Sequence, residues 1–309
     1  VRDRHGARVP LPDERELYAL LGLPLVPPEM REGEGELAAA AESLPRLVTA
    51  ADVRGVLHCH STYSDGVATI ADLAQAARSR GWAYLGISDH SQSAFYAGGL
   101  SPADVARQHD EIDELNATLD DFTILKGIEA DIRPNGDLDY DDATLDRFDY
   151  VIGSVHSQFK MSESEMTSRI VGALENPRLT ILGHPTGRLL LAREPYAVDM
   201  DTVIEKAAET GVAIELNADP RRLDLDWRLC RRAKERGVTI EIGPDAHSVN
   251  GLDNVAIGVG IARKGWLEAD DILNARSADD VLAFANARRE RVGLARATHR
   301  SPQDDDIPF

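Results

Sequence analysis

The sequence has few cysteines, no long apolar run and no excess of basic residues. Its two cysteines, Cys59 and Cys230, rule out a disulfide scaffold and fit a reducing, cytoplasmic compartment. No apolar run approaches the ~18 residues of a membrane-spanning helix, so we expect no membrane partner. With 34 Lys and Arg against 53 Asp and Glu, the net charge of -19 argues against a protein that binds nucleic acid through a broad basic face.

Several catalytic signatures are also missing from the 309 residues. There is no Gly-x-Ser-x-Gly elbow for a serine nucleophile and no Walker motif for a nucleotide phosphate. The Gly-x-Gly-x-x-Gly turn of dinucleotide-binding sheets does not follow the first expected strand. The acidity leaves metal binding open, because metal ions need carboxylates.

The chain divides into three parts. Residues 1–53 predict two short helices at 13–21 and 34–44 on either side of a proline-rich stretch, and we interpret this part as a linker or N-terminal arm. Residues 54–290 form the regular part. Residues 291–309 end in an acidic stretch without helical pattern and are expected to be disordered. Because the chain begins with Val1 rather than Met, we expect it to be a piece of a longer protein.

Short apolar runs alternate with helical stretches along the regular part. Strands are predicted at 56–60, 84–90, 123–130, 150–156, 179–185, 212–218 and 239–245, and helices at 70–80, 102–119, 163–175, 199–210 and 226–236. Seven strand–helix repeats predict an α/β fold with a parallel sheet closed into a barrel. An open doubly wound sheet is the alternative.

Most of the histidines fall at or just after the end of a predicted strand. Six do so, and two carboxylates occupy the same position on further strands; the set is His58, His60, His90, His156, His184, His247, Glu129 and Asp245. In an α/β barrel these ends form one face, where active sites lie. Imidazoles and carboxylates suit zinc, manganese or iron, and so many ligands imply two or three ions.

The neighbours of these residues are less certain. Asp65 lies five residues past His60, and we expect it to be a further ligand. Cys59 should point away from the histidines on either side of it, and Asp89 should face away from His90 and orient a neighbour. The remaining histidines are expected to be solvated; they are His5, His109 and His299.

Clustered divalent ions favour phosphate ester hydrolysis, with a metal-bound hydroxide as the nucleophile that attacks phosphorus. Arginines near the strand ends could hold the phosphate oxygens. The candidates are Arg188, Arg221 and Arg222.

Six segments resemble the PHP (polymerase and histidinol phosphatase) family: HCHSTYSDG (58–66), ISDH (87–90), GIE (127–129), GSVH (153–156), GHP (183–185) and DAH (245–247). The resemblance implies a distorted (β/α)7 TIM-like barrel with three divalent ions, Mn²⁺ or Zn²⁺ or Fe²⁺. It implies one ion held by His58, His60, Glu129 and Asp245, a second by Glu129, His156 and His184, and a third by Asp65, His90 and His247. Glu129, Asp245 and His60 are the expected catalytic residues.

Within that family, the GHPTGR (183–188) and ELNA (215–218) segments look like the C-terminal domain of bacterial family X DNA polymerases, and residues 21–32 resemble the linker that precedes it. The resemblance implies a manganese-dependent 3′–5′ exonuclease and 3′-end-processing phosphoesterase that acts on DNA 3′ ends, with a polymerase half upstream. The last six residues, DDDIPF with the terminal Phe309, look like the tip of bacterial single-stranded-DNA-binding proteins. That likeness implies recruitment of a repair protein.

Two other functions fit the same residues. The chain could be a stand-alone phosphatase for small phosphate esters, of the histidinol-phosphate or nucleotide type, which its acidity favours. It could also be a non-catalytic, metal-stabilised scaffold, although the complete ligand set argues against this.

Overall fold

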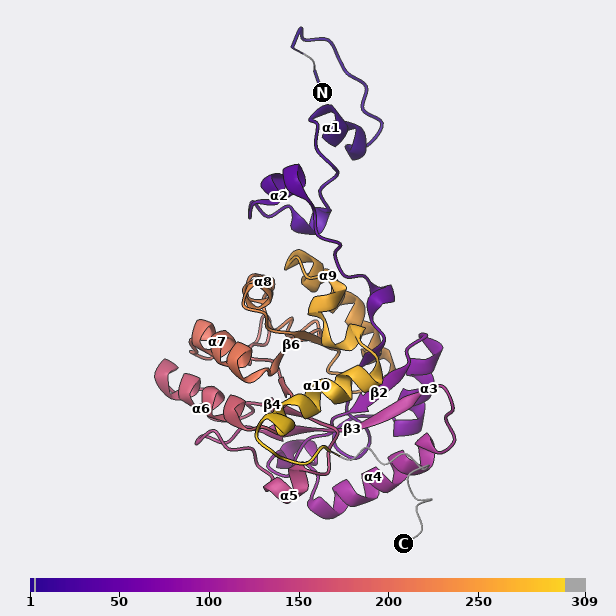
Figure 1. The fold of residues 1–309 in the computed structure, drawn as a ribbon, viewed down its shortest axis with the longest axis vertical. Coiled ribbons are helices and arrows are strands. Elements are labelled where there is room, and N and C mark those ends of the chain that lie inside the picture. The colour runs from indigo at the N-terminus through magenta and orange to yellow at the C-terminus, as the bar shows by residue number, and fades with distance from the viewer. Residues whose placement is uncertain (3, 298–309) are drawn as a thin grey trace.

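A computed structural model describes residues 1–2 and 4–297 of the chain. Its centre is one sheet of seven parallel strands in sequence order (Figure 1). The strands are β1 (Gly55–Val56), β2 (Tyr84–Ile87), β3 (Thr123–Asp131), β4 (Tyr150–Ser154), β5 (Ile181–Leu182), β6 (Ala213–Asn217) and β7 (Ile240–Gly243). All seven predicted strands are present, and the predicted barrel is confirmed.

Helices follow the strands in turn. They are α3 (Ile70–Ser79), α4 (Pro102–Asn116), α5 (Asp142–Leu145), α6 (Glu163–Glu175), α7 (Met200–Thr210), α8 (Trp227–Glu235), α9 (Val255–Lys264) and α10 (Ala278–Arg291). The five helices expected in this part are confirmed within a few residues, whereas α5, α9 and α10 were not anticipated. None of the helices in the described part of the chain is long and apolar enough to span a membrane.

The barrel closes between β7 and β1 in two places. Beyond the strand ends, Cys59 pairs with Ala246 in a parallel bridge. In the second place, the side chain of Asn274 lies between β1 and β7 and fills the seam between these two strands. Its Nδ2 donates to the carbonyls of Gly55 and Ile242, each at 3.1 Å, and its Oδ1 accepts from the Ile242 N–H at 3.0 Å. One buried amide therefore supplies the hydrogen bonds that an eighth strand would otherwise make.

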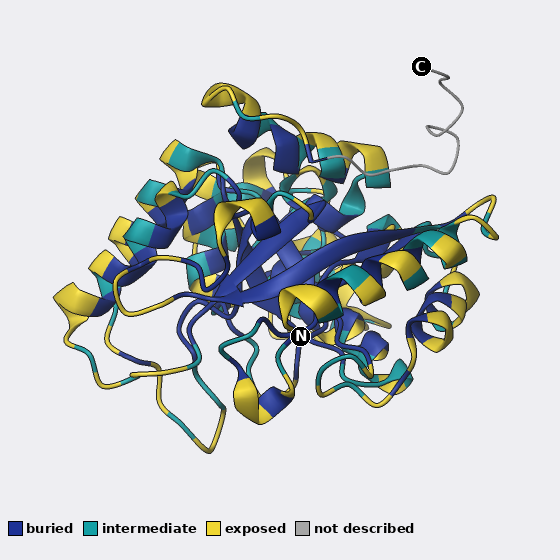
Figure 2. Ribbon diagram, turned by 90° about the horizontal axis from the view of Figure 1, so that it is seen from below, coloured by how far each residue is buried: buried dark blue, intermediate teal, exposed yellow. Residues whose placement is uncertain are grey.

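The strands of the barrel are buried along their length (Figure 2). The Tyr150 ring crosses the barrel interior, and its hydroxyl donates to the carbonyls of Leu57 and Ile87. A Cβ atom at Gly86 or Gly127 would lie 2.2 Å from this side chain, so both positions must be glycine for the ring to fit. At one end, α10 lies across the strands and packs apolar side chains against the barrel floor.

The N-terminal arm extends away from the barrel and includes α1 (Glu14–Leu20) and α2 (Glu36–Glu42), close to the two helices that were predicted there (Figure 1). Its second half is fastened to α9 by ion pairs between Glu29 and Arg263 at 2.7 Å and between Glu32 and Lys264 at 2.6 Å. The acidic tail expected over 291–309 falls mostly outside the described residues, as do His299 and the terminal hexapeptide, although α10 itself runs to Arg291.

His109 was expected to be solvated, and this prediction is wrong. It lies on the buried face of α4 with Val105, Gln108 and Ile112, and its ring meets the Phe148 ring edge-on at 5.1 Å. Burial, with the nearby charge of Lys126, lowers the pKa of His109 to about 3. The imidazole is therefore neutral in the folded protein.

Replacing His109 with Leu is expected to reduce the loss of stability in acid. The unfolded chain takes up a proton at its ordinary pKa of about 6.5, whereas the folded protein does so only near 3. His109 therefore favours unfolding increasingly as the pH falls below 6.5, by about 2 kcal/mol at pH 5 relative to pH 7. Urea unfolding of both proteins at pH 7 and pH 5 measures the difference, and equal pH dependence would contradict the prediction. Other buried histidines contribute equally to both proteins.

Candidate metal centre

The predicted ligands meet at the carboxyl ends of the strands. The chain beyond β1 carries His58, His60 and Asp65, and the chain beyond β2 carries His90; Glu129 lies in β3; His156 and His184 follow β4 and β5, and Asp245 and His247 follow β7. Most of these side chains are buried, and Asp65 and His247 lie at the rim. Although β1 ends at Val56, the extended chain beyond it still directs His58 and His60 to the same side.

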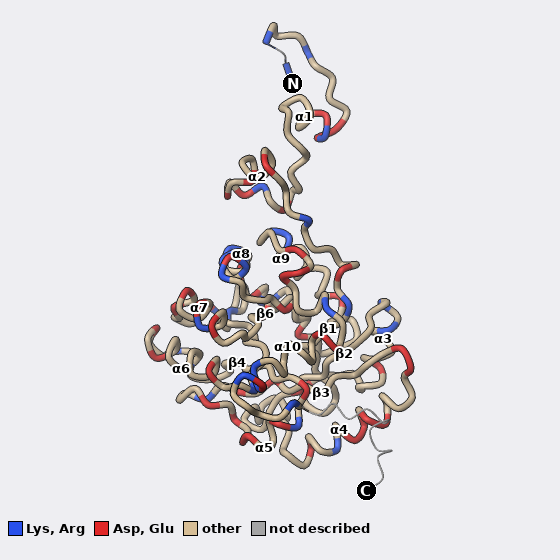
Figure 3. The backbone as a smooth tube through the Cα atoms, in the orientation of Figure 1, with Lys and Arg blue, Asp and Glu red and all other residues tan. Residues whose placement is uncertain are grey.

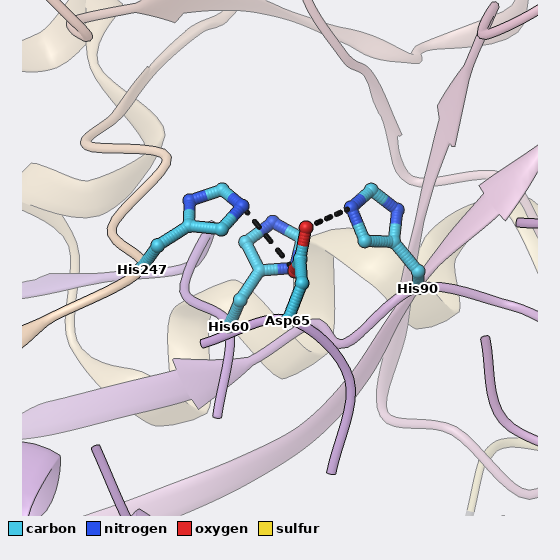
Figure 4. A group of neighbouring side chains, drawn as sticks. All are labelled: His60, Asp65, His90 and His247. Atoms are coloured by element: carbon cyan, nitrogen blue, oxygen red, sulfur yellow. Dashed lines mark ion pairs between the residues drawn. The ribbon is translucent and has the colours of Figure 1, made fainter. Parts of the chain in front are cut away.

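Three groups of side chains could each hold an ion, because the ligand atoms within a group all lie within 4.8 Å of one another. The groups are His60, Asp65, His90 and His247; His58, His60 and Asp245; and His90, Glu129 and His156. Figure 4 shows the first, in which Asp65 pairs with His90 and His247. His60 and His90 each belong to two groups, so neighbouring sites would share ligands.

Glu129 is at the centre of the cluster. Its Oε1 lies 2.9 Å from Nε2 of His184, 3.3 Å from Nε2 of His156 and 3.5 Å from Nε2 of His58. Its Oε2 lies 2.9 Å from Nδ1 of His90 and 3.7 Å from Nε2 of His60. One carboxylate therefore faces five imidazoles and can bridge ions.

Unpaired nitrogens show that this cluster fits metal ions. His58 Nε2 and both ring nitrogens of His60 are buried without a hydrogen-bond partner in the described part of the chain, and so is Glu129 Oε2. Buried polar atoms of this kind are costly unless something binds them. Imidazole and carboxylate ligands without thiolate suit zinc, manganese and iron.

The protonation states of the ligands fit the same role. Burial and the neighbouring His90 lower the pKa of His60 to about 4, and burial with Arg222 lowers that of His184 to about 3, so both are neutral and able to coordinate. Against the effect of burial, the carboxylate of Glu129 raises the pKa of His90 to about 10 and that of His156 to about 9. Metal binding at these two would release protons.

Glu129 and Asp245 are ionised in this setting. Burial alone would raise the pKa of each, but the imidazoles of His156 and His90 hold the pKa of Glu129 well below its usual range. His58 and His60 do the same for Asp245. The carboxylates are therefore available as charged ligands at neutral pH.

Three residues to which the sequence analysis gave no individual role hold the ligands in place. Glu215 in β6 bonds Nδ1 of His58 at 2.5 Å and accepts the backbone N–H of His184. Asp131 bonds Nδ1 of His156 at 2.6 Å, and the Asn217 amide donates to Asp245. An acidic or amide residue inside an apolar strand was the available signal.

Asp89 acts as expected on the loop that carries Asp65. It faces away from the ion groups and accepts hydrogen bonds from the backbone and hydroxyl of Ser61, from the hydroxyl of Ser64 and from the amide of Gln108. The loop around Asp65 is fixed by these contacts. Cys59 is also buried away from the cluster, and burial raises the pKa of its thiol well above the usual value.

Two of the ligands have a strained backbone. His184 and Asp245 have positive φ angles of 22° and 49°, in the left-handed region that side chains other than glycine rarely adopt. Each such residue costs on the order of 1–3 kcal/mol and persists only where the surroundings hold it. Here Glu215 and Asn217 provide that support.

The three arginine candidates lie in different settings. Arg222 is beside the cluster, with Nε 3.2 Å from Asp245 Oδ2 and Nη1 buried without a partner among the described residues. Arg188 is turned toward the carbonyls of Arg222 and Leu223 and so supports that loop. Arg221 is mostly exposed and pairs with Asp219. Arg222 is the one that the structure brings to the ligands.

A Glu215→Gln substitution is expected to weaken Mn²⁺ affinity by about 10- to 100-fold, the usual cost of losing the partner that orients a ligating histidine. The neutral amide cannot satisfy both the His58 ring and the His184 N–H. Competition with a chelator measures the affinity. Glu175→Gln, at an exposed helix end, is the control. Equal affinities in Glu215→Gln and the unmodified protein would contradict this role.

The parallel barrel and the shared carboxylate–histidine cluster at its carboxyl face define a metal-dependent hydrolase. The chain belongs to the PHP domain family, which matches residues 57–219. The DNA polymerase beta thumb family matches residues 1–32.

Individual relatives are similar over most of the chain. The DNA polymerase/3'-5' exonuclease PolX of Bacillus subtilis is 47% identical over 273 residues, which cover 88% of this chain and 48% of that protein. The chain thus spans about half the length of this relative. A probable phosphatase of Caldanaerobacter subterraneus is 28% identical over 78% of this chain and 95% of its own length. A solved histidinol phosphate phosphatase from Lactococcus lactis is 16% identical, with a TM-score of 0.47, and covers 78% of this chain and 94% of its own.

Proposed function

We propose that this chain is a cytoplasmic phosphoesterase that shortens DNA from the 3′ end and processes 3′ termini, as the PHP domain of a family X DNA polymerase. The observation that carries the proposal is the cluster around Glu129, in which three groups of ligands share His60 and His90. The thumb match at residues 1–32 and the PolX relative support a polymerase half upstream and a DNA substrate.

We assign the ligands to three divalent ions as the family resemblance implies: His58, His60, Glu129 and Asp245 to one, Glu129, His156 and His184 to the second, and Asp65, His90 and His247 to the third. The groups of close ligand atoms support this in part, since they combine His90, rather than His184, with Glu129 and His156. His184 itself lies 2.9 Å from Glu129. Ions bound here would supply hydroxide near neutral pH and stabilise charge on the phosphate oxygens. Mn²⁺ and Zn²⁺ both suit this mixture of imidazole and carboxylate, as does Fe²⁺.

The protein groups have separate tasks in this reaction. Glu129 would offset the positive charge of the bound ions through both of its carboxylate oxygens. Asp245 and His60 hold the ligand group nearest Arg222, whose unpartnered Nη1 can donate to a phosphate oxygen. Arg188 keeps the Arg222 loop in place through its carbonyl contacts, and Arg221 would reach a phosphate only from the rim.

A second candidate is a phosphatase for small phosphate esters. Several probable phosphatases among the relatives match this chain over nearly their whole length, 95% in one case and 96% in another. The net charge of -19 also gives the chain little electrostatic attraction for DNA.

Hydrolysis assays with added Mn²⁺ distinguish the two. A 5′-labelled oligonucleotide, the same strand with a 3′-phosphate, histidinol phosphate and a nucleoside monophosphate are compared side by side, with His60→Ala as the inactive control. Stepwise shortening of the DNA that is lost in His60→Ala supports the 3′-end activity. Turnover of the small esters alone would overturn it in favour of the phosphatase. No turnover of any ester, with unfolding on chelation, would leave a metal-stabilised scaffold.

We also propose that residues 304–309 dock a repair protein. The aromatic Phe309 and the preceding acidic run are the features that support this. Deleting residues 307–309 should abolish binding to the repair proteins that recognise the tip of single-stranded-DNA-binding proteins. Unchanged binding would show that the tail is only a solvated end.

A further inference from the structure

Two aromatic side chains stand out on the surface. In the described part of the chain only Phe95 and Tyr96 are exposed among the aromatic residues, at 88% and 72%. They are neighbours on a short 3-10 helix, Phe95–Ala97, in the loop that follows β2. The same loop begins next to His90, one of the shared metal ligands.

The loop that carries this pair is fixed. Its ends are joined by a bridge between Ser91 and Leu100. The hydroxyl of Ser91 and the N–H of Ser93 both donate to the carboxylate of Asp139, at 2.7 and 2.9 Å. Gly99 packs so closely on the chain that a Cβ there would lie 1.9 Å from the Ser91 carbonyl. The backbone that carries the two rings is therefore in place before any ligand arrives, which lowers the entropy cost of binding.

Tyr96 lies against the metal ligands. Its ring centre is 6.2 Å from that of His90 and 6.5 Å from that of His156. A molecule with its phosphorus at the ligand cluster would have its adjoining group beside this ring.

The loops after His156 and His184 carry further flat groups. The Phe159 ring is stacked on Tyr196 with their centres 6.2 Å apart, and the Arg193 guanidinium lies 4.2 Å from the centre of Phe159. These side chains line a hollow of about 570 Å³. Flat aromatic and guanidinium surfaces are the groups on which unpaired bases stack.

Charge near Tyr96 does not favour a grip on the DNA backbone. The helix that follows the loop, α4, carries five acidic residues and one Arg (Figure 3). The DNA phosphates would be repelled along α4, so contacts on this side of the site are better made to an uncharged part of the strand. Base stacking is such a contact.

We propose that Tyr96, with Phe95 beside it, stacks on an unpaired nucleobase next to the phosphodiester that is cut. This inference rests on the proposed action on DNA 3′ ends and assigns the residues that hold the end of the strand. A ring fixed at the edge of the ligand cluster would place the phosphodiester at the ions by holding the base attached to it.

The test pairs a change in the protein with a change in the DNA. Single-stranded 5′-labelled oligonucleotides carry an abasic residue at the last or the penultimate position, and kcat/KM with Mn²⁺ is compared with that for the intact strand. In the unmodified protein, removing the stacked base should lower kcat/KM by about tenfold, as expected for the loss of one base–aromatic contact. In Tyr96→Leu the intact and abasic strands should be cut equally, whereas Tyr96→Phe should keep the difference.

The outcomes separate this inference from the function on which it rests. If the unmodified protein does not cut the intact strand, the proposed 3′-end activity itself fails. If the unmodified protein cuts DNA but Tyr96→Leu prefers the intact over the abasic strand to the same degree, the stacking role is overturned and the 3′-end activity stands. Since each comparison is a ratio within one variant, a change in metal loading or in the folded fraction does not imitate the result.

Discussion

Glu129→Gln is expected to lose about a thousandfold or more in kcat/KM on DNA or on any phosphate ester, because a bound metal contributes several kcal/mol of charge stabilisation. The substitution keeps the shape of the side chain and removes the charge that faces five imidazoles. An amide can no longer bridge two ions through anionic oxygens. Metal content measured after gel filtration in Mn²⁺ should fall in parallel.

Glu114→Gln on the exposed face of α4 removes one negative charge without touching the cluster and is the matched control. The folded state of Glu129→Gln is checked by its circular dichroism. A folded variant that retains full metal content and more than about a tenth of the activity would show that the central carboxylate is not a bridging ligand.

The second large effect is expected on stability. Asn274→Leu should lower the free energy of unfolding by about 3–5 kcal/mol, since burying an unsatisfied polar group costs about 1–3 kcal/mol each. The substitution leaves three backbone groups in the seam without a partner: the carbonyls of Gly55 and Ile242 and the N–H of Ile242. Leucine has the same branching as asparagine and is larger, so the substitution leaves no cavity.

Chemical denaturation of Asn274→Leu and of Asn135→Leu compares the seam with an exposed turn, where Asn135 bonds only the neighbouring Asp137. The Asn135→Leu variant should lose well under half as much free energy of unfolding as Asn274→Leu. Similar losses at the two positions would mean that the barrel does not depend on Asn274 for its closure.

The ligand cluster could be predicted because it depends on the ends of strands alone. The carboxyl ends of parallel strands meet at one face whatever the exact length of each strand. The expected position of His58 on this face therefore did not depend on the length of β1, which ends two residues before it. The same argument places His184 and Asp245 on that face, but it says nothing of their left-handed backbone, which depends on contacts with Glu215 and Asn217.

His109 shows a signal that was present and not used. It lies four residues after Val105 and three before Ile112, on the apolar stripe of α4, and helical spacing alone would have placed it inside. Asn274 left no such signal, because it lies in a short 3-10 helix whose role depends on two strands far away in the sequence. Periodicity reports which face of an element is buried and carries no information about gaps between distant elements.

The tyrosine that crosses the barrel has a consequence for how relatives of this chain can diverge. Tyr150 occupies the space above Gly86 and Gly127, and neither glycine can gain a side chain while the ring is there. The three positions lie on three adjacent strands, and we expect them to change together in evolution. A smaller residue must first replace Tyr150, and only then can a larger residue replace the glycine at 86 or 127. Single substitutions at the glycines would be eliminated, whereas paired ones would survive.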